Sequence, residues 1–336
     1  MAEREDEPVS GEDRLIARYF RPLATDPGAL GLLDDAATIT PPPGSDVVLK
    51  TDAVVGGVHF FPDDPPDMIA RKALRVNLSD LAAKGARPAG FLLSLALPQA
   101  LGEDWLEAFA RGLGEDASAY HCPLMGGDTD RTPGPLCISI AAFGIVPSGT
   151  MVRRHGARPG DLVVVTGTIG DAALGLHVRR DPGTATRWRL DERQRDHLVG
   201  RYLLPQPRNA LAEALRLHAT AAMDVSDGLA GDLGKLCAVS GVAADVEVAC
   251  VPLSDAARKA VAGDRALFET ALTGGDDYEV VATVPVQARD ALMAAARAAG
   301  VALTEIGVIR TDRPGAYFLD HGGKPLEFKK ASFSHF

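Results

Sequence analysis

Short apolar runs alternate with amphipathic stretches along the chain, and this alternation predicts an α/β protein. In the amphipathic stretches, apolar side chains recur three and four positions apart, as at Leu106, Phe109 and Leu113, which is the spacing of one helix face. The apolar runs are short and rich in β-branched residues, which is typical of strands. In the first half, the predicted strands are Val47–Leu49, Phe91–Leu97 and Leu136–Val146, and the predicted helices are Met68–Lys84 and Asp104–Tyr120.

The same alternation starts again after Pro147-Ser148-Gly149, a turn-forming triplet that predicts a domain boundary. We therefore expect one domain over residues 1–148 and a second, α/β domain over residues 149–336, with mixed rather than purely parallel sheets. The predicted strands of the second half are Asp161–Thr166, a run ending at Met223–Asp224, Val242–Val248 and Tyr278–Val284, and the predicted helices are Asp171–Val178, Asp227–Ser240 and Arg289–Ala299.

Aspartate and glycine mark the expected ends of these helices. Asp67 and Asp104 stand where N-caps are expected, and Asp227 could cap the helix that follows it. Gly241 and Gly300 follow predicted helices and are expected to end them.

Composition and charge narrow the class of protein. The chain has 336 residues, of which 46% are hydrophobic, and a formal net charge of −10, which fits a globular enzyme of two domains. A nucleic-acid binder or a binder of anionic membranes would need a basic face. The most basic stretch, Arg179–Arg201, mixes seven arginines with four acids, so we interpret it as a solvated helical surface.

The sequence shows neither the pattern of a targeting signal nor the cysteine spacing of a zinc site or a disulfide framework, and both observations favour a cytoplasmic enzyme. No apolar run reaches the ~18–20 residues that a membrane span needs, and the polar, acidic opening MAEREDEPVSGEDR is not expected to be a signal peptide. The four cysteines form no CxxC pair. We therefore expect buried free thiols in a reducing compartment rather than zinc ligands or disulfides.

Aspartates gather where apolar runs give way to predicted turns. Any single one is better explained by turn or cap chemistry than by a functional site. Together they suggest a site, because loops at one edge of an α/β sheet can converge, and converging carboxylates need a cation. Oxygen ligands without His or Cys favour Mg²⁺ over zinc. The residues are Asp34-Asp35, Thr51-Asp52, Asp80, Asp128, Asp130, Asp224, Asp227 and Asp276-Asp277.

Glycine pairs supply candidate phosphate contacts, since backbone N–H groups there can approach an anion closely. Gly126-Gly127 and Gly274-Gly275 are two such pairs, and Gly167–Gly170 follows a strand and precedes a helix, the geometry for a phosphate at a helix N-terminus. The dinucleotide-binding G-x-G-x-x-G motif, the P-loop motif and the protein-kinase H-R-D and D-F-G motifs are absent from the sequence.

Six segments resemble segments of the thiamine-monophosphate kinase family and occur in the same order as they do there. The resemblance extends over residues 12–336. Each segment alone is a weak signal, whereas the ordered set is specific. The segments are TDAVVGGVHF (51–60), VNLSDLAAKGARP (76–88), GGDTD (126–130), VTGTIGDAALGL (165–176), MDVSDGL (223–229) and TGGDDYE (273–279).

The resemblance implies a two-domain aminoimidazole-ribonucleotide-synthetase-like fold with mixed sheets and flanking helices. It implies transfer of the ATP γ-phosphate to thiamine monophosphate with several Mg²⁺ ions. It also implies an N-terminal domain that binds metal and ATP and pairs with its copy in a homodimer. Transferred onto this chain, the metal positions are Asp35, Thr51, Asp52, Asp80, Asp128, Asp224 and Asp227, of which Asp52, Asp128 and Asp224 are the expected catalytic centre. The ATP contacts are Tyr120, Gly127, Asp128, Arg154 and Ser226, and the thiamine-phosphate contacts are His59, Asp276 and Phe333.

This chain departs from the family pattern at two positions. Leu33 stands where the family often has glycine before the aspartate pair, and Lys50 stands where many members have a metal-touching hydroxyl. A protonated lysine cannot ligate Mg²⁺, so one auxiliary ion site is affected.

The proposed nucleophile, a phosphate oxygen of the substrate, is mostly dianionic at neutral pH because its second pKa is about 6. A general base is therefore not required, and we expect direct in-line transfer without a phosphoenzyme. Two alternatives stay open at this point. One is another ATP-dependent synthetase of the same superfamily, although the selenophosphate synthetases usually carry a reactive residue near the N-terminus and the first cysteine here is Cys122. The other is a catalytically silent nucleotide-binding homologue.

Overall fold

The computed structural model describes residues 11–311, 314–330 and 332–333. The chain divides into two compact units. The first comprises residues 1–43, 49–77 and 88–143, and the second comprises residues 44–48, 78–87 and 144–336. No helix in the described ranges is both long enough and apolar enough to cross a lipid bilayer.

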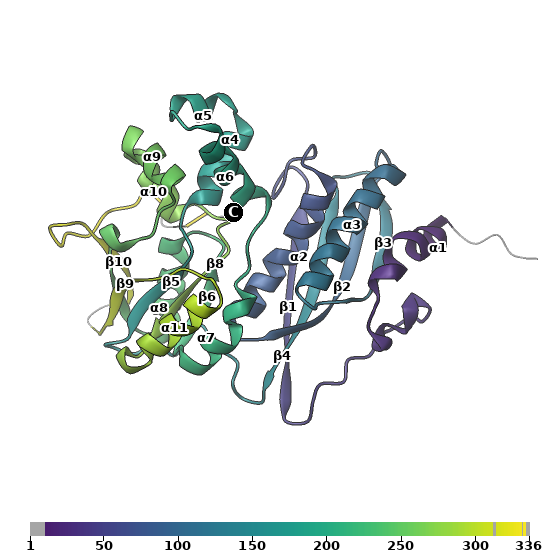
Figure 1. Cartoon of the computed structure of the whole chain (residues 1–336), viewed down its shortest axis with the longest axis horizontal. Coiled ribbons are helices and arrows are strands. Elements are labelled where there is room, and N and C mark those ends of the chain that lie inside the picture. Colours follow the sequence, from purple (N-terminus) through teal and green to yellow (C-terminus); the bar gives the residue numbers. More distant parts are fainter. Residues whose placement is uncertain (1–10, 312–313, 331, 334–336) are drawn as a thin grey trace, which may run out of the picture. The chain divides into compact units, whose positions relative to one another are not determined.

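A four-stranded sheet in the order β1-β4-β2-β3 organises the first unit. Its strands are β1 (Ser45–Val55), β2 (Arg87–Pro98), β3 (Leu124–Thr132) and β4 (Cys137–Pro147). Helices α2 (Pro66–Ala83) and α3 (Glu103–Ala119) lie on one face of this sheet (Figure 1), and a short helix, α1 (Gly11–Leu15), precedes it. β2 and β3 run parallel, and Ser94 pairs with Asp128.

Alternate residues of these strands are buried, which is the pattern of a sheet with one covered face. Leu93, Leu95 and Leu97 on β2 are buried, as are Ile138, Ile140 and Ala142 on β4. The helix face predicted for α3 is confirmed, because Leu106, Phe109, Leu113 and Ala117 are all buried.

Both expected N-caps of the first unit are wrong. α2 begins at Pro66, a residue suited to the first helical turn because it needs no N–H partner, so Asp67 lies inside the helix. α3 has Gly102 as its N-cap, and Asp104 lies in its first turn. Both carboxylates thus lie near the positive end of a helix dipole instead of at the cap itself.

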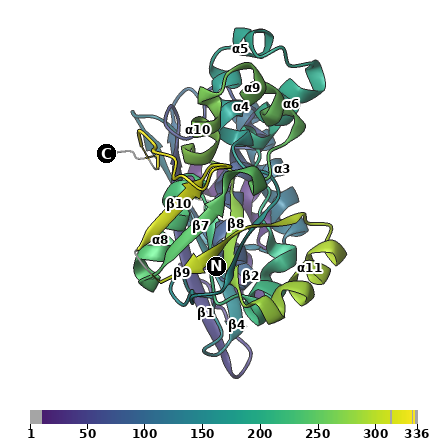
Figure 2. The same cartoon turned by 90° about the vertical axis from the view of Figure 1, so that its left-hand side faces the viewer.

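A six-stranded sheet in the order β10-β7-β9-β5-β8-β6 organises the second unit, and its strands β10, β7 and β9 are labelled in Figure 2. It is mixed, as expected: β7 and β10 run parallel, whereas β5 runs antiparallel to β8 and β9. The strands are β5 (Leu162–Thr166), β6 (Ala221–Val225), β7 (Ala243–Glu247), β8 (Glu279–Val284), β9 (Leu303–Arg310) and β10 (Gly315–Leu319).

Helices cover both faces of the six-stranded sheet, so its central strands are apolar on both sides. On β5, Val163 and Val165 pack in a cluster with residues of α8 (Leu229–Ser240). Val164 packs on the opposite side with residues of α7 (Ala212–His218) and α11 (Arg289–Ala298). A third cluster joins α4 (Asp171–Arg180), α5 (Gly183–Arg187), α6 (Glu192–Leu203), α9 (Asp255–Gly263) and α10 (Ala266–Thr273).

Two further expectations need correction. Asp227 is not a helix cap, because α8 begins at Leu229 with Gly228 as its N-cap, while Gly241 ends the helix as expected. All four cysteines are free, but only Cys122 and Cys237 are buried, whereas Cys137 is half-buried and Cys250 is exposed. Burial raises the pKa of the Cys122 and Cys237 thiols to about 12.

Candidate active site

Thr51 and Asp52 lie inside a strand and do not follow one. β1 continues through Ala53-Val54-Val55 because these apolar residues extend the pleated pattern, with Val54 buried. Asp52 is half-buried, and the Lys50 ammonium lies 3.1 Å from its Oδ1 atom. Lys50 therefore already pairs with the carboxylate that the resemblance assigns to a metal.

Gly127 and Asp128 likewise lie inside β3, where a Gly-Gly turn was expected. A Cβ atom at position 127 would lie 1.9 Å from the Leu93 carbonyl oxygen on β2. This glycine is therefore required for the close approach of two neighbouring strands. Asp128 is exposed on the edge strand.

The four-stranded sheet keeps Asp52 and Asp128 apart within one chain. β1 and β3 are its two edge strands, with β4 and β2 between them. Three strand spacings of about 4.8 Å separate the edges by about 14 Å. A single Mg²⁺ ion, with ligands at about 2.1 Å, cannot contact both carboxylates of the same chain.

His59 lies in the turn that follows β1, and the backbone determines its tautomer. The Val55 N–H donates to His59 Nδ1 at 3.0 Å, so this nitrogen accepts and the neutral ring carries its proton on Nε2. The buried Lys72 ammonium donates to the His59 carbonyl oxygen at 2.9 Å. His59 is thus a half-buried, anchored side chain with a defined donor nitrogen.

Tyr120 and Asp35 lie at the ends of other elements in the first unit. Tyr120 is the C-cap residue of α3, and the Arg75 guanidinium lies 5.5 Å from the centre of its ring. Arg75 in turn donates two hydrogen bonds to the buried Asp116 carboxylate, at 2.5 and 2.9 Å. Asp35 is exposed in the segment that precedes β1.

In the second unit, backbone hydrogen bonds bring four of the predicted residues together. The Asp276 N–H donates to the Ser226 carbonyl oxygen at 2.9 Å, and the Phe333 N–H donates to the Asp227 carbonyl oxygen at 3.0 Å. A Cβ atom at Gly275 would lie 2.5 Å from the Ser226 oxygen, so the two loops pack backbone to backbone there. Asp276 is held at φ +73°, which is uncommon for a residue with a side chain.

Asp224 and Asp80 lie beside this group of loops. Asp224 is buried on β6, two residues before Ser226. Asp80 lies within α2, inside the helix predicted over Met68–Lys84. The neighbouring Ser79 hydroxyl donates to the Tyr278 carbonyl oxygen at 3.5 Å, which links this helix to the loop that carries Asp276.

The helix N-terminus predicted for phosphate is filled by a side chain of the protein. Asp277 is fully buried, and its carboxylate accepts from the N–H groups of Gly170 and Ala172, at 2.6 and 3.2 Å. Burial raises the pKa of Asp277 well above its ordinary range. The start of α4 is therefore capped internally, and the expectation of a phosphate there is wrong.

Glu279 forms a second buried ion network that the sequence did not reveal. Its carboxylate accepts from the Thr166 hydroxyl at 2.6 Å and from Arg201 at 2.9 Å, and Arg208 donates to both of its oxygens. Arg201 is buried, so the interpretation of Arg179–Arg201 as a solvated surface fails at its last residue. The only signal in the sequence was the acidic end of TGGDDYE.

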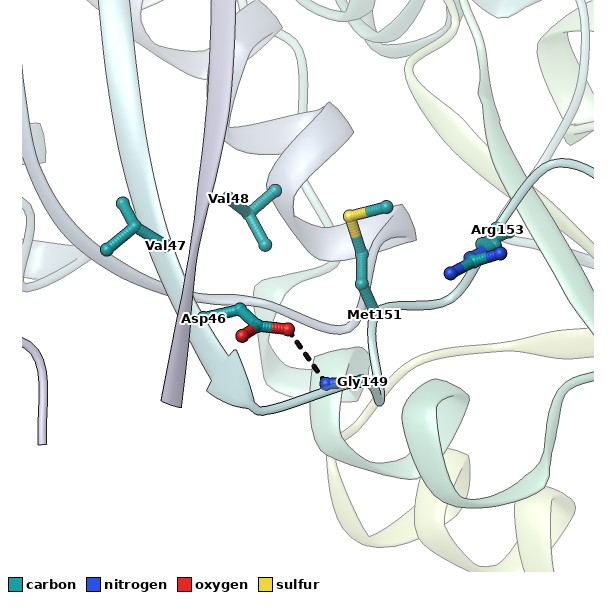
Figure 3. Close-up of a pocket in the computed structure, with 6 residues that line it drawn as sticks. All are labelled: Asp46, Val47, Val48, Gly149, Met151 and Arg153. Carbon is teal, nitrogen blue, oxygen red and sulfur yellow. Dashed lines mark hydrogen bonds between the residues drawn. The ribbon is translucent and has the colours of Figure 1, made fainter. Parts of the chain in front are cut away.

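Arg154 is exposed and lines a basic cavity of about 550 Å³ with Lys84, Arg153, His155, Met151 and Val239. A smaller adjoining cavity of about 200 Å³ shares Arg153 and Met151 (Figure 3). There the Asp46 carboxylate accepts from the Gly149 N–H at 2.7 Å, a hydrogen bond that lowers the pKa of Asp46. The Lys84 ammonium donates to the Ala222 carbonyl oxygen at 2.8 Å, so one wall of the larger cavity is anchored to β6.

The donor chemistry of the predicted metal positions fits Mg²⁺, since they comprise only aspartates and Thr51. In the part of the chain that the structure describes, no three His, Cys, Asp or Glu side chains form a group that could hold a metal ion. The placement of Asp52 and Asp128 on opposite edges of a sheet is one reason.

Two family models match the chain and identify its class. The chain matches the model of the AIR synthase related protein, N-terminal domain, over residues 33–146 and that of the C-terminal domain over residues 158–319. It therefore has the two-domain α/β fold of that superfamily.

Within the superfamily, the chain belongs to the thiamine-monophosphate kinase family. It is 43% identical over 329 residues to the thiamine-monophosphate kinase of Salmonella typhimurium, covering 97% of this chain and 98% of that protein. The crystal structure of thiamine-monophosphate kinase from Stenotrophomonas maltophilia is 41% identical, with a TM-score of 0.82 over 94% of this chain and 96% of that one. The structure of AaThiL complexed with AMPPCP and TMP is 30% identical, with a TM-score of 0.76 over 90% and 91% of the two chains.

Proposed function

We propose that this chain phosphorylates thiamine monophosphate with ATP. A phosphate oxygen of thiamine monophosphate attacks the γ-phosphorus atom, a new P–O bond forms, and the bond to the β,γ-bridging oxygen breaks. The products are thiamine diphosphate and ADP. The observation that carries the proposal is the likeness to thiamine-monophosphate kinases over nearly the full chain, together with a relative complexed with AMPPCP and TMP, a ligand pair that fits an ATP analogue and the acceptor.

The loops of the second unit support the placement of both substrates. Ser226 and Asp276 are joined by a backbone hydrogen bond, and Phe333 is joined to Asp227 by another. We assign Ser226 to ATP, and Asp276 and Phe333 to thiamine monophosphate. Phe333 is exposed, so its ring is accessible for stacking on an aromatic ring of the substrate.

Arg154 would act as a clamp for the phosphates of ATP. Its cavity also contains Lys84, Arg153 and His155, and this local positive charge contrasts with a chain of net charge −10. A cavity with several cationic side chains concentrates polyanions. Tyr120 and Gly127 are the ATP contacts that we assign to the first unit, and the Arg75–Asp116 pair holds Tyr120 in place.

Several Mg²⁺ ions would be held by Asp35, Thr51, Asp52, Asp80, Asp128, Asp224 and Asp227. When bound, such ions offset the repulsion between two polyanions and stabilise the charge on the transferred group. Asp52, Asp128 and Asp224 form the proposed catalytic centre. The Lys50 ammonium beside Asp52 supplies one positive charge in this region without being a metal ligand.

Transfer would be direct, because the attacking phosphate is already mostly dianionic and needs no general base. His59 would donate a hydrogen bond from its Nε2–H group to a phosphate oxygen of thiamine monophosphate, since Nδ1 is occupied by the Val55 N–H. A radiolabelled aspartyl-phosphate trapped during a single turnover would contradict direct transfer.

The exposed face of the four-stranded sheet supports a homodimer through the N-terminal domain. Opposite the helix-covered face, Leu49 is 70% exposed, and Val47 and Leu92 are also exposed. An apolar sheet face of this kind is typical of an interface. A second copy of the same sheet is self-complementary to it under two-fold symmetry.

Such a dimer would also resolve the separation of Asp52 from Asp128. Edge strands have unpaired backbone groups that favour pairing with another strand. If two copies of the sheet close on each other, β1 of one copy meets β3 of the other. Asp52 of one chain and Asp128 of its partner would then contribute to the same site.

The decisive experiment measures the products made by the purified chain. We expect ADP and thiamine diphosphate in equal amounts, with ATP consumption that requires both thiamine monophosphate and Mg²⁺. ATP consumption that proceeds equally without thiamine monophosphate, or no turnover at all, would contradict the proposal. We also propose that the reaction takes place in the cytoplasm, a reducing compartment in which the free cysteines of this chain would stay reduced.

A further inference from the structure

Lys235, on helix α8, contacts two carboxylates at once. Its ammonium lies 2.5 Å from Asp227 Oδ2 and 2.9 Å from Asp232 Oδ1. Asp232 and Lys235 are three residues apart on the same helix, the spacing at which side chains of one helix face meet. Asp227, in contrast, lies in the loop before the helix, at a proposed metal position.

The two partners of Lys235 differ in how firmly they are fixed. The Asp232 side chain is fully buried, and its Oδ2 atom accepts from the N–H groups of Ser226 and Asp227, at 3.0 and 2.8 Å. Asp232 therefore fixes the backbone of the loop. Asp227 has a side chain that is 37% exposed, and its described side-chain contact is Lys235.

Lys235 can give up its contact with Asp227 more easily than its contact with Asp232. The Lys235 ammonium lies between two carboxylates. If it moves away from Asp227, it keeps the buried Asp232 carboxylate as a partner, so no buried charge is left alone.

We infer that Lys235 is a built-in counter-ion that holds the Asp227 carboxylate until a divalent cation takes its place. This inference rests on the proposed function, because it takes Asp227 to be a metal position. Lys235 gives up Asp227 when Mg²⁺ binds and remains paired with Asp232. The lysine therefore stabilises the metal-free loop and weakens the binding of the ion that uses Asp227.

The experiment compares divalent-cation binding to matched variants, with Mn²⁺ as the probe and electron paramagnetic resonance to measure the free ion. Lys235→Met removes the competing ammonium, so we expect Mn²⁺ to bind about two- to fivefold more tightly than to the wild-type chain, the range expected for an exposed ion pair. Lys259→Met is the control, since Lys259 contacts Gln194 on the surface and the variant has the same net charge.

A double-mutant cycle assigns the effect to Asp227. In the Asp227→Asn background, Lys235→Met should leave Mn²⁺ binding unchanged. Thermal melting gives a second readout: without divalent ions Lys235→Met should melt below wild type, and added Mg²⁺ should reduce the difference.

The outcomes separate the inference from the proposed function. If Lys235→Met and Lys259→Met bind Mn²⁺ equally while Asp227→Asn loses a site, the counter-ion role is refuted and the metal position stands. If Asp227→Asn binds as many ions as wild type, Asp227 is not a ligand and the inference is overturned with it. If the wild-type chain binds no Mn²⁺, the metal part of the proposed function is contradicted as well.

Discussion

His59 shows how the main chain can define the chemistry of one side chain. Because the Val55 N–H occupies Nδ1, the neutral imidazole offers a proton only at Nε2. A donor of this kind suits a phosphate oxygen. The Lys72 ammonium also donates to the His59 carbonyl oxygen, and this hydrogen bond holds the backbone from which the imidazole ring projects.

Replacing this side chain should affect one substrate selectively. We expect His59→Ala to raise KM for thiamine monophosphate by about tenfold, the cost of one hydrogen bond to a charged group, while KM for ATP changes little. Steady-state kinetics with each substrate varied in turn provides the test, with His321→Ala, at an exposed surface histidine, as the control. A larger change in KM for ATP would assign His59 to the nucleotide.

Asp52 is a proposed metal ligand, so the role of its charge can be tested directly. Asp52→Asn keeps the size of the side chain but removes the negative charge that a metal ion needs, so kcat should fall by about two orders of magnitude or more. Circular dichroism and melting temperature should match wild type, because the substitution keeps the size and shape of a half-buried side chain. Near-normal turnover would remove Asp52 from the metal site.

At the scale of elements, Asp171 joins three helices of the second unit. This buried carboxylate at the start of α4 accepts from the Thr168 hydroxyl at 2.6 Å, from Ser254 at the start of α9 at 2.5 Å and from His197 on α6 at 2.9 Å. Burial acts to raise its pKa, but the hydrogen bonds from His197, Ser254 and Thr168 outweigh burial and lower it.

Removing this junction should therefore destabilise the protein in a pH-dependent way. Asp171→Asn should cost about 1–3 kcal/mol in the free energy of unfolding at pH 7, because an amide nitrogen cannot accept these hydrogen bonds. Because the pKa of Asp171 is lowered, its contribution to the free energy of unfolding is fully present above pH 3.8, the ordinary pKa of an aspartate. The contribution is lost as the pH falls below that value.

Urea denaturation at several pH values measures this difference. The gap between wild type and Asp171→Asn should be constant from pH 7 to about pH 5 and should narrow on further acidification. Asp264→Asn, at an exposed helix end, is the matched control and should show a small gap at every pH. A gap that widens in acid would contradict the assignment.

Local patterns were sufficient to predict part of the secondary structure, because apolar periodicity is a local property. They did not predict helices α7, α9 and α10 or strands β9 and β10. α11 and β5 lie within two residues of their expected bounds. The errors arose where a neighbour distant in sequence decides the outcome. Asp277 caps α4 from 107 residues away, and Gly127 faces the Leu93 carbonyl. No local pattern contains either contact.

The candidate site was predicted from ordered motifs, not from geometry. The resemblance assigns Ser226 to ATP and Asp276 to thiamine monophosphate, and these roles stay predictions. The backbone hydrogen bond between the two residues was not predicted, because nothing in their spacing required it. The contact between Lys235 and Asp227 was missed, because a lysine eight residues after an aspartate has no characteristic pattern when a turn lies between them. The separation of Asp52 from Asp128 depends on strand order, which the sequence does not state.

At the scale of the whole molecule, the apolar sheet face makes the homodimer testable. Leu49→Glu places a charge in the proposed interface and should shift the protein from dimer to monomer in light scattering coupled to size-exclusion chromatography. Leu217→Glu is the matched control, since Leu217 is 63% exposed on α7 of the second unit. A dimer that survives Leu49→Glu unchanged would place the interface elsewhere.

Mixing two inactive variants tests whether sites are shared between copies. In a dimer of Asp52→Asn with Asp128→Asn, one site would carry both substitutions and the other would carry neither. Random exchange should then restore about a quarter of wild-type activity, because half of the dimers are mixed and each has one intact site. Sites built from a single chain would show no recovery on mixing.

The internal cap of α4 also bears on how the chain is made. The N–H groups of Gly170 and Ala172 find their acceptor only once residue 277 has been synthesised, and β5 gains its neighbours β8 and β9 only when residues 279–310 follow. During synthesis, β5 and the start of α4 cannot form these contacts until the last third of the chain has left the ribosome. We therefore expect the second unit to fold late and as one unit.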